Sequence, residues 1–162
     1  MATMEIPLVD KRLKAELAEL KRCPLPFANV EPREDNFRVW DGVLLGPENT
    51  PYEGGKFNFK LEFYSDYPNV PPRVTFKTRI YHCNFNSLGQ ICLSTLKTEE
   101  NKGTWCSAMG VSSLILSIHQ LIGDANFDDP LVSSIRDQYR ADPKEHDRIA
   151  REWTLRFAPL NG

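Results

Sequence analysis

The segment KFNFKLEFY, residues 56–64, alternates apolar and polar side chains without a break. Its apolar residues occupy every second position and so project from one side of an extended chain: Phe57, Phe59, Leu61 and Phe63. A strand of this kind covers a core on one side and meets water on the other, as many antiparallel strands do. The segment therefore predicts a half-buried strand of an antiparallel sheet.

Two further segments near it are rich in β-branched and aromatic residues, which favour strands. They are FRVWDGVLL, residues 37–45, and RVTFK, residues 73–77. Turn-forming stretches separate the three segments, with GPENTPYEGG before the alternating one and YPNVPP after it. Strands that follow one another across short connections predict a meander.

An amphipathic helix is predicted before the strands, over residues 10–22. Leu13, Leu17 and Leu20 recur there at helical spacing. Asp10 is a suitable N-cap, and two prolines that follow residue 22 end the helix.

Helical patterns return after the strands. Apolar residues between 111 and 122 recur at helical spacing, and Gly123 is a suitable stop. Two charged helical segments follow, over residues 131–140 and 143–157, with Pro143 suited to a first helical turn. Because the strands are grouped rather than alternating with helices, the predicted fold class is α+β.

The length of 162 residues suits one domain, 1–162, with a core at about residues 8–158. Apolar residues make up 41% and charged residues 26%, the mix of a soluble globular protein. The net charge of −2 argues against nucleic acid as a main partner, because phosphate binding requires a basic face. No apolar run reaches the roughly 18 residues that span a bilayer, and we expect no secretion signal. We also expect a monomer, located in the cytoplasm, the nucleus or both.

Residues 80–105 show little periodicity. Loops longer than about 12–15 residues are uncommon in compact domains and are often functional. This one carries His82, Cys83, Asn84 and Cys92, which together suit a metal site, a disulfide, a structural corner or a nucleophile with supporting groups. Zinc sites usually show close ligand pairs such as Cys-x-x-Cys, which this chain lacks, and cytosolic cysteines stay reduced. We therefore expect neither a metal nor a disulfide.

Two interpretations of Cys92 follow from the residues alone. Between Ile91 and Leu93 it suits a small buried side chain, as free cysteines often are. Alternatively, the loop presents its thiol as a nucleophile, and the amide of Asn84 stabilises the oxyanion formed when an acyl group is attacked. Asn84 also suits a turn, and His82, beside an aromatic residue, need not be a base and suits a hydrogen-bonded structural group.

The same segment resembles the active-site region of ubiquitin-conjugating enzymes, whose signature is Tyr-His-Pro-Asn, a glycine-containing turn and Ile-Cys-Leu. The matching residues here are Tyr81–Asn84 and Gly89–Leu93. Four other stretches resemble family motifs in the same order, so the resemblance covers almost the whole chain: GPENTPYEGGKF, SDYPNVPPRVTF, NFDDPL and DRIAREWTLRFA. It implies the α+β fold of that family, an antiparallel four-stranded meander with an N-terminal helix and C-terminal helices.

The resemblance implies a transferase that carries ubiquitin, or a ubiquitin-like protein, as a thioester on Cys92. A separate activating enzyme would supply the modifier and consume the ATP, so no cofactor is expected, in line with the lack of a Gly-x-x-x-x-Gly-Lys-Ser/Thr phosphate loop. Asn84 would stabilise the developing negative charge or brace the loop, and Asp129 would orient the incoming lysine. Other residues would support this active-site loop: Tyr81, His82 and Ser94.

The implied further partner is a ligase, either of the RING type or one that relays the modifier through its own cysteine. Positions that contact such ligases in the family fall on the N-terminal helix and on two loops: Lys11, Arg12, Asn69, Ser107 and Ala108. From the residues alone, Lys11 and Arg12 are typical of an ordinary solvated helix face.

Several residues depart from the family pattern. Cys83 replaces proline, which stiffens a turn, so a more mobile loop with a second thiol is expected. Asn69 replaces an apolar residue, Ser107 a proline and Ser94 an aspartate, and residues 97–104 form an insertion. The insertion, CLS and NFDDPL resemble carriers of the Nedd-type modifier, whereas the final helix resembles the ubiquitin class. Two alternatives to a ubiquitin carrier therefore stand: a Nedd-type carrier, and a binding-only variant of the fold, although such variants lack the active cysteine that this chain keeps.

Overall fold

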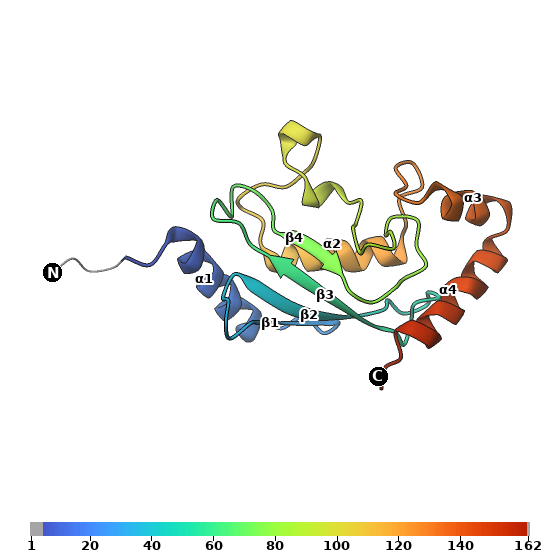
Figure 1. Cartoon of the computed structure of the whole chain (residues 1–162), viewed down its shortest axis with the longest axis horizontal. Coiled ribbons are helices and arrows are strands. Elements are labelled where there is room, and N and C mark those ends of the chain that lie inside the picture. Colours follow the sequence, from blue (N-terminus) through green and yellow to red (C-terminus); the bar gives the residue numbers. More distant parts are fainter. Residues whose placement is uncertain (1–4, 162) are drawn as a thin grey trace.

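The computed structural model describes residues 5–161, in which one four-stranded sheet is flanked by helices (Figure 1). The elements follow in this order: α1 (Leu8–Arg22), β1 (Ala28–Pro32), β2 (Val39–Leu45), β3 (Lys56–Glu62), β4 (Arg73–Phe76), the 3-10 turns η1 (Ser94–Leu96) and η2 (Glu99–Asn101), α2 (Val111–Gly123), α3 (Ser133–Ala141) and α4 (Pro143–Phe157). All neighbouring strands pair antiparallel in the order β1-β2-β3-β4. The predicted α+β meander is confirmed.

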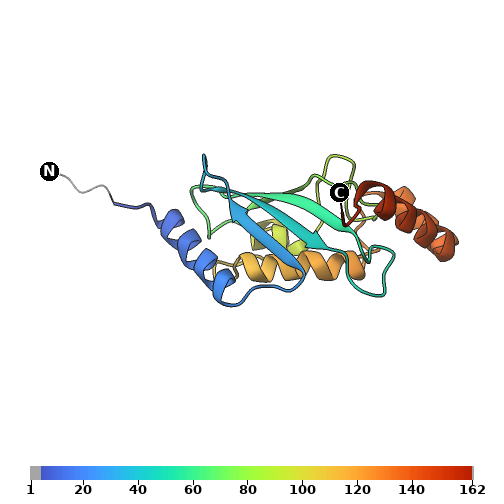
Figure 2. The ribbon, with the colours of Figure 1, turned by 90° about the horizontal axis from the view of Figure 1, so that it is seen from below.

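The buried face of the sheet packs on α2, which runs beneath the strands in Figure 2. The alternation in β3 places Phe57, Phe59 and Leu61 in the core, as predicted. The ring of Phe59 lies against Gly42 of β2, where a Cβ would approach it to 2.4 Å, so this register requires glycine. Six apolar residues of α2 at helical spacing close the core from below: Val111, Leu114, Ile115, Ile118, Leu121 and Ile122.

Two predictions about helix ends are corrected, and one strand is added. α1 begins at Leu8, and Asp10 does not cap it, because the Asp10 carboxylate instead accepts a hydrogen bond from Arg38 at 3.1 Å. The sequence pattern did not indicate β1, which is only five residues long and buries only Val30. α3 begins at Ser133 rather than at residue 131, because the amides of residues 131 and 132 both donate to the Cys83 carbonyl, at 2.8 and 2.9 Å.

The remaining helix ends agree with the sequence pattern. α2 ends at Gly123. Pro143 occupies the first turn of α4, whose N-terminus is capped by Asp142 through the backbone N–H of Glu145 at 3.2 Å. Among residues 5–161, none of the helices combines the length and the apolar character needed to cross a membrane. α1 and the α3–α4 pair lie at opposite ends of the sheet (Figures 1 and 2).

Candidate active site

The segment between β4 and α2 is irregular, as predicted, but it is held by a dense set of hydrogen bonds. A turn at Asn86–Gln90 is closed by the Asn86 side chain, which accepts from the backbone N–H groups of Leu88 and Gln90, each at 3.0 Å. Gly89 in this turn has φ +82, and a Cβ there would lie 2.1 Å from the Phe76 carbonyl oxygen. The turn therefore returns the chain against β4 and delivers Cys92 to the surface.

The Cys92 thiol is partly exposed and lies beside a carboxylate. Its backbone N–H donates to the Asn84 carbonyl at 2.9 Å, and its Sγ lies 3.3 Å from Oδ2 of Asp129. Partial burial raises the pKa of Cys92, and the hydrogen bond to Asp129 and its charge raise that pKa further. The resting side chain is therefore a protonated thiol at neutral pH. Of the two interpretations of Cys92, the fully buried side chain is not the one observed.

Asn84 is buried, and its side chain is used completely by the chain segment around Asp129. Its Nδ2 donates to the carbonyl oxygens of Asn126 and Asp129 at 3.0 and 3.1 Å, and its Oδ1 accepts from the Asn126 backbone N–H at 2.9 Å. We call this set, Asn84 with Asn126 and Asp129, the Asn84 junction. Both amide protons are engaged, so the side chain braces the loop and places Asp129 next to Cys92.

His82 holds the same loop from inside the core. Its Nε2 lies 2.8 Å from the Leu121 carbonyl oxygen at the end of α2, and its Nδ1 accepts from the Asn84 backbone N–H at 3.0 Å. Burial lowers the pKa of His82 to about 4, so the ring is neutral at physiological pH. Both nitrogens are occupied, which makes His82 a structural residue rather than a base.

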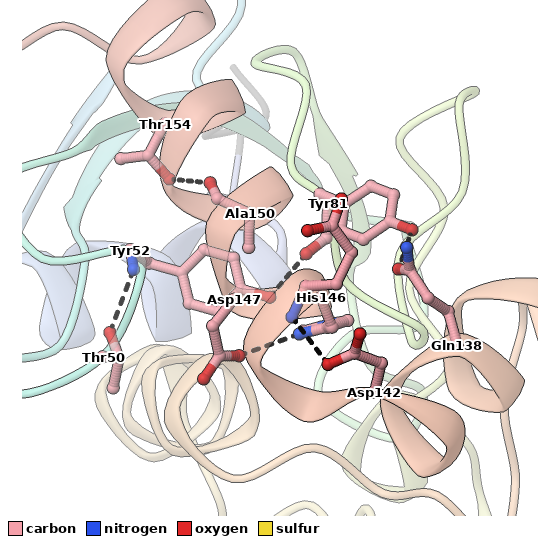
Figure 3. Close-up of polar contacts among 10 residues, drawn as sticks. Thr50, Tyr52, Tyr81, Gln138, Asp142, His146, Asp147, Ala150 and Thr154 are labelled. Atoms are coloured by element: carbon pink, nitrogen blue, oxygen red, sulfur yellow. Dashed lines mark hydrogen bonds and ion pairs between the residues drawn. The ribbon is translucent and has the colours of Figure 1, made fainter.

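Tyr81 ties the loop to α3 and α4 (Figure 3). Its hydroxyl donates to the Gln138 side chain, and its carbonyl accepts from the Tyr52 hydroxyl. Its ring packs on His146 and Trp153, with centroid distances of 5.4 and 5.3 Å. The loop therefore rests on the sheet end, on α2 and on both C-terminal helices.

Cys83 stands where the motif that this loop resembles has proline, and its backbone carbonyl fixes the start of α3 through the two bonds described above. Its thiol is buried and lies 3.6 Å from Oδ1 of Asn84. All four cysteines are free. The backbone at Cys83 is thus held by hydrogen bonds to the start of α3 rather than by a proline ring. That this loop is more mobile than one with proline stays a prediction.

Ser94 opens η1 and anchors the insertion. Its carbonyl accepts from the Thr104 backbone N–H at 2.9 Å, and the hydroxyls of the two residues lie 3.4 Å apart. The Trp105 backbone N–H donates to the Lys97 carbonyl at 3.0 Å. The insertion therefore closes on itself as a compact loop that begins five residues after Cys92.

The five predicted ligase-contact residues lie on three segments that adjoin one another. Lys11 is exposed, as are Asn69, Ser107 and Ala108. Arg12 is not a free surface residue, because its guanidinium donates to the carbonyls of Ser107 and Met109 at 2.9 and 2.6 Å. It therefore ties α1 to the loop before α2.

Glu16 organises this surface, although nothing in the sequence motifs indicated it. One carboxylate oxygen accepts from the Val111 backbone N–H at 2.7 Å, at the start of α2. The other accepts from the Tyr67 hydroxyl and pairs with Arg12 at 3.3 Å. The i,i+4 spacing of Arg12 and Glu16 was the available signal. We call Arg12, Glu16, Tyr67 and Val111 the Glu16 junction.

The sequence was compared with models of known protein families. A family model described as ubiquitin-conjugating enzyme matches residues 12–154. The match runs from α1 into α4 and includes the Cys92 loop, both junctions and the insertion.

Proposed function

Because the chain belongs to the ubiquitin-conjugating enzyme family, we propose that it carries ubiquitin as a thioester on Cys92 and passes it to a substrate lysine with a ligase. The observation that carries this proposal is the partly exposed Cys92 thiol, 3.3 Å from the Asp129 carboxylate on a segment locked by Asn84. The partners would be an activating enzyme, ubiquitin and a ligase, and the protein itself would need no cofactor. We place these encounters in the cytoplasm or the nucleus.

In the loading step, Cys92 Sγ attacks the thioester carbonyl that joins ubiquitin to a cysteine of the activating enzyme. A new C–S bond to Cys92 forms, the old C–S bond breaks, and the Cys92 proton passes to the departing thiol. The raised pKa of Cys92 means that this proton must leave during the reaction, within the complex with the activating enzyme.

In the transfer step, a lysine amine attacks the thioester carbonyl on Cys92. The C–N bond forms, the C–S bond breaks, and the amine loses a proton as the Cys92 thiolate leaves. Free lysine has a pKa near 10.4, so at neutral pH fewer than about one in a thousand amines are nucleophilic. The Asp129 carboxylate, placed by the Asn84 junction, would hold the incoming ammonium and accept a hydrogen bond as the amine attacks.

We assign ligase docking to the face formed by Lys11, Asn69, Ser107 and Ala108. These residues are exposed, and the Glu16 junction fixes the segments that carry them. Asn69 offers a polar contact where an apolar one is usual. Arg12 would act mainly by positioning the loop at Ser107.

The test is a loading assay with activating enzyme and ATP, run in parallel with ubiquitin and with a Nedd-type modifier. We expect a ubiquitin adduct that a thiol reductant removes, no adduct with Cys92→Ala, and a reductant-resistant oxyester with Cys92→Ser. Normal loading of Cys92→Ala would contradict the assignment of the nucleophile. Loading with the Nedd-type modifier alone would assign that modifier instead, and the failure of both would favour a binding-only role.

A further inference from the structure

A cavity of about 250 Å³ lies behind the active-site loop. One wall is formed by His82 and Cys83, and another by residues 122–125 and Phe127 at the end of α2 and beyond it. The remaining walls come from the turn at residues 49–52 and from the two C-terminal helices, which contribute Tyr139, His146 and Asp147. The catalytic scheme proposed above makes no use of this space.

The walls are rich in aromatic rings. Phe127 and Tyr139 stack with centroids 4.6 Å apart, and the rings of Tyr139 and His146 are perpendicular with centroids 5.0 Å apart. Tyr52 and His82 lie 5.7 Å apart on the opposite part of the lining. Aromatic faces carry partial negative charge and therefore attract cations.

The cavity also carries net negative charge. Its lining, among the described residues, includes the carboxylates Asp124 and Asp147 and neither lysine nor arginine. Oδ1 of Asp147 lies 2.9 Å from Nδ1 of His146, and within residues 5–161 no hydrogen bond engages its other oxygen or the Asp124 carboxylate. Figure 3 shows Asp147 and His146 on α4 beside Tyr52. His82 adds no positive charge, because burial lowers its pKa to about 4.

Two carboxylates among aromatic rings suit a guanidinium, which stacks on rings and is more weakly hydrated than an ammonium group. The volume of about 250 Å³ is below the roughly 300–1,000 Å³ typical of sites for larger ligands, so one side chain fits better than a cofactor. The chain's own Arg136 on α3 pairs with Asp137 at 3.0 Å and does not line the space. We propose that the cavity binds a single arginine side chain of a partner protein.

The position of the cavity links its occupant to the catalytic loop. Cys83, in one wall, directly precedes Asn84, and the residues that flank Asn126, Ala125 and Phe127, lie in another wall. An arginine there contacts both sides of the Asn84 junction and so changes the placement of Asp129 relative to Cys92. This coupling rests on the proposed function, whereas the binding itself does not. By thermodynamic linkage, loading of Cys92 then changes the affinity for arginine by the same factor as arginine binding changes the loading equilibrium.

The binding test uses the full chain without any modifier. A blocked Gly-Arg-Gly peptide, the same peptide with neutral citrulline in place of arginine, and agmatine are each titrated while backbone amide NMR shifts are followed. We expect the arginine peptide and agmatine to shift the amides of Cys83, Ala125 and Phe127, and the citrulline peptide to bind about tenfold or more weakly. Asp124→Asn with Asp147→Asn should weaken arginine binding by a similar factor.

The matched control is Glu34→Gln with Asp35→Asn, which removes two exposed carboxylates from the connection between β1 and β2 and should leave binding unchanged. A second variant, Ala125→Leu, reduces the volume without changing charge and should also block binding. Unaltered binding by either cavity variant would overturn the proposal, and so would equal binding of the citrulline peptide. Binding of agmatine without binding of the peptide would overturn the assignment to a partner protein. Because no thioester is involved, a failed loading assay leaves these outcomes interpretable.

Discussion

The Asn84 junction and the Glu16 junction connect distant segments by different chemistry. Each uses one side chain to join segments far apart in the sequence, the first at the active site and the second at the proposed ligase face. Asn84 is a neutral amide that is fully buried. Glu16 is a carboxylate with 13% of its side chain exposed, and its partner Arg12 is 31% exposed.

The two junctions should therefore respond differently to salt and to the loss of their central side chain. A buried amide adds no formal charge beside Cys92, and its bonds respond little to salt, but its removal leaves buried carbonyl and N–H groups without partners. A partly exposed ion pair is screened by salt and contributes less to stability. The Asn84 junction is therefore held by the hydrogen bonds of a neutral amide, whereas the proposed ligase face is held in part by an ion pair that salt can weaken.

Removing the Asn84 junction should have the largest effect on transfer activity. In Asn84→Ala the segment at Asn126–Asp129 loses three hydrogen bonds, so Asp129 is no longer held at Cys92. We expect discharge onto free lysine to fall about 10²-fold, as a displacement of about 1 Å can cause, while loading falls much less. Single-turnover discharge and loading rates measure this, with the exposed Asn101→Ala as the control. Equal slowing of both steps would indicate a collapsed loop instead.

Acid should lower the stability of the protein near the Asn84 junction, because it protonates His82. The pKa of His82 is about 4 in the folded protein and 6.5 without burial, so folding favours the neutral ring. The resulting stability is complete above about pH 6.5 and is lost as the pH falls toward 4, by about 3 kcal/mol in total. Denaturant unfolding at several pH values measures the loss. His82→Asn should show a smaller loss over this window, and an unchanged pH dependence in that variant would refute the role of His82.

Breaking the Glu16 junction should reduce ligase-dependent activity by a smaller factor, which depends on salt. Arg12→Glu breaks two bonds to the carbonyls of Ser107 and Met109 and repels Glu16. We expect ligase-stimulated discharge to fall about tenfold, with loading affected less. Lys11→Glu changes the same charge on the same helix without breaking the junction, so it separates direct docking from loop positioning. Ligase-dependent discharge that neither variant alters would show that this face is not the docking site.

Replacing Cys83 by the proline of the family motif should have the smallest effect on loading and stability. Among the described residues no hydrogen bond uses the Cys83 backbone N–H, so Cys83→Pro removes no donor that the loop needs. We expect loading to change by less than about twofold and stability to rise by about 0.4–1 kcal/mol, because proline restricts the unfolded chain. A large loss of loading, measured beside Tm, would give Cys83 a chemical role of its own.

Periodicity was enough to predict the α+β class, β3 and α2, because each has a long apolar face that a local pattern reveals. β1 escaped that pattern, because it is short and buries only Val30. Asp10 was a reasonable cap by residue type, but Arg38, 28 positions away, competes for its carboxylate. Local sequence carries no signal for such a distant partner.

The candidate site likewise contains residues that sequence motifs indicate and contacts that they do not. Motif order brought Cys92, Asn84 and Asp129 together, and the structure places them within one set of hydrogen bonds. The sequence left the role of Asn84 open between stabilising an oxyanion and bracing the loop, because the choice depends on where residues 126–129 return. Glu16 and the arginine cavity depend on contacts among several elements, which no single motif contains.

The protonated state of Cys92 has a consequence for the unloaded protein. Thiolates, rather than thiols, react with electrophiles and with peroxide, and the pKa of this thiol lies above its usual value. We therefore expect the unmodified Cys92 thiol to react more slowly with alkylating agents and with peroxide than an ordinary cysteine of similar exposure. Under the proposed function, Cys92 loses its proton only when a partner presents an acyl group already activated as a thioester, which would favour that reaction over reaction with other electrophiles.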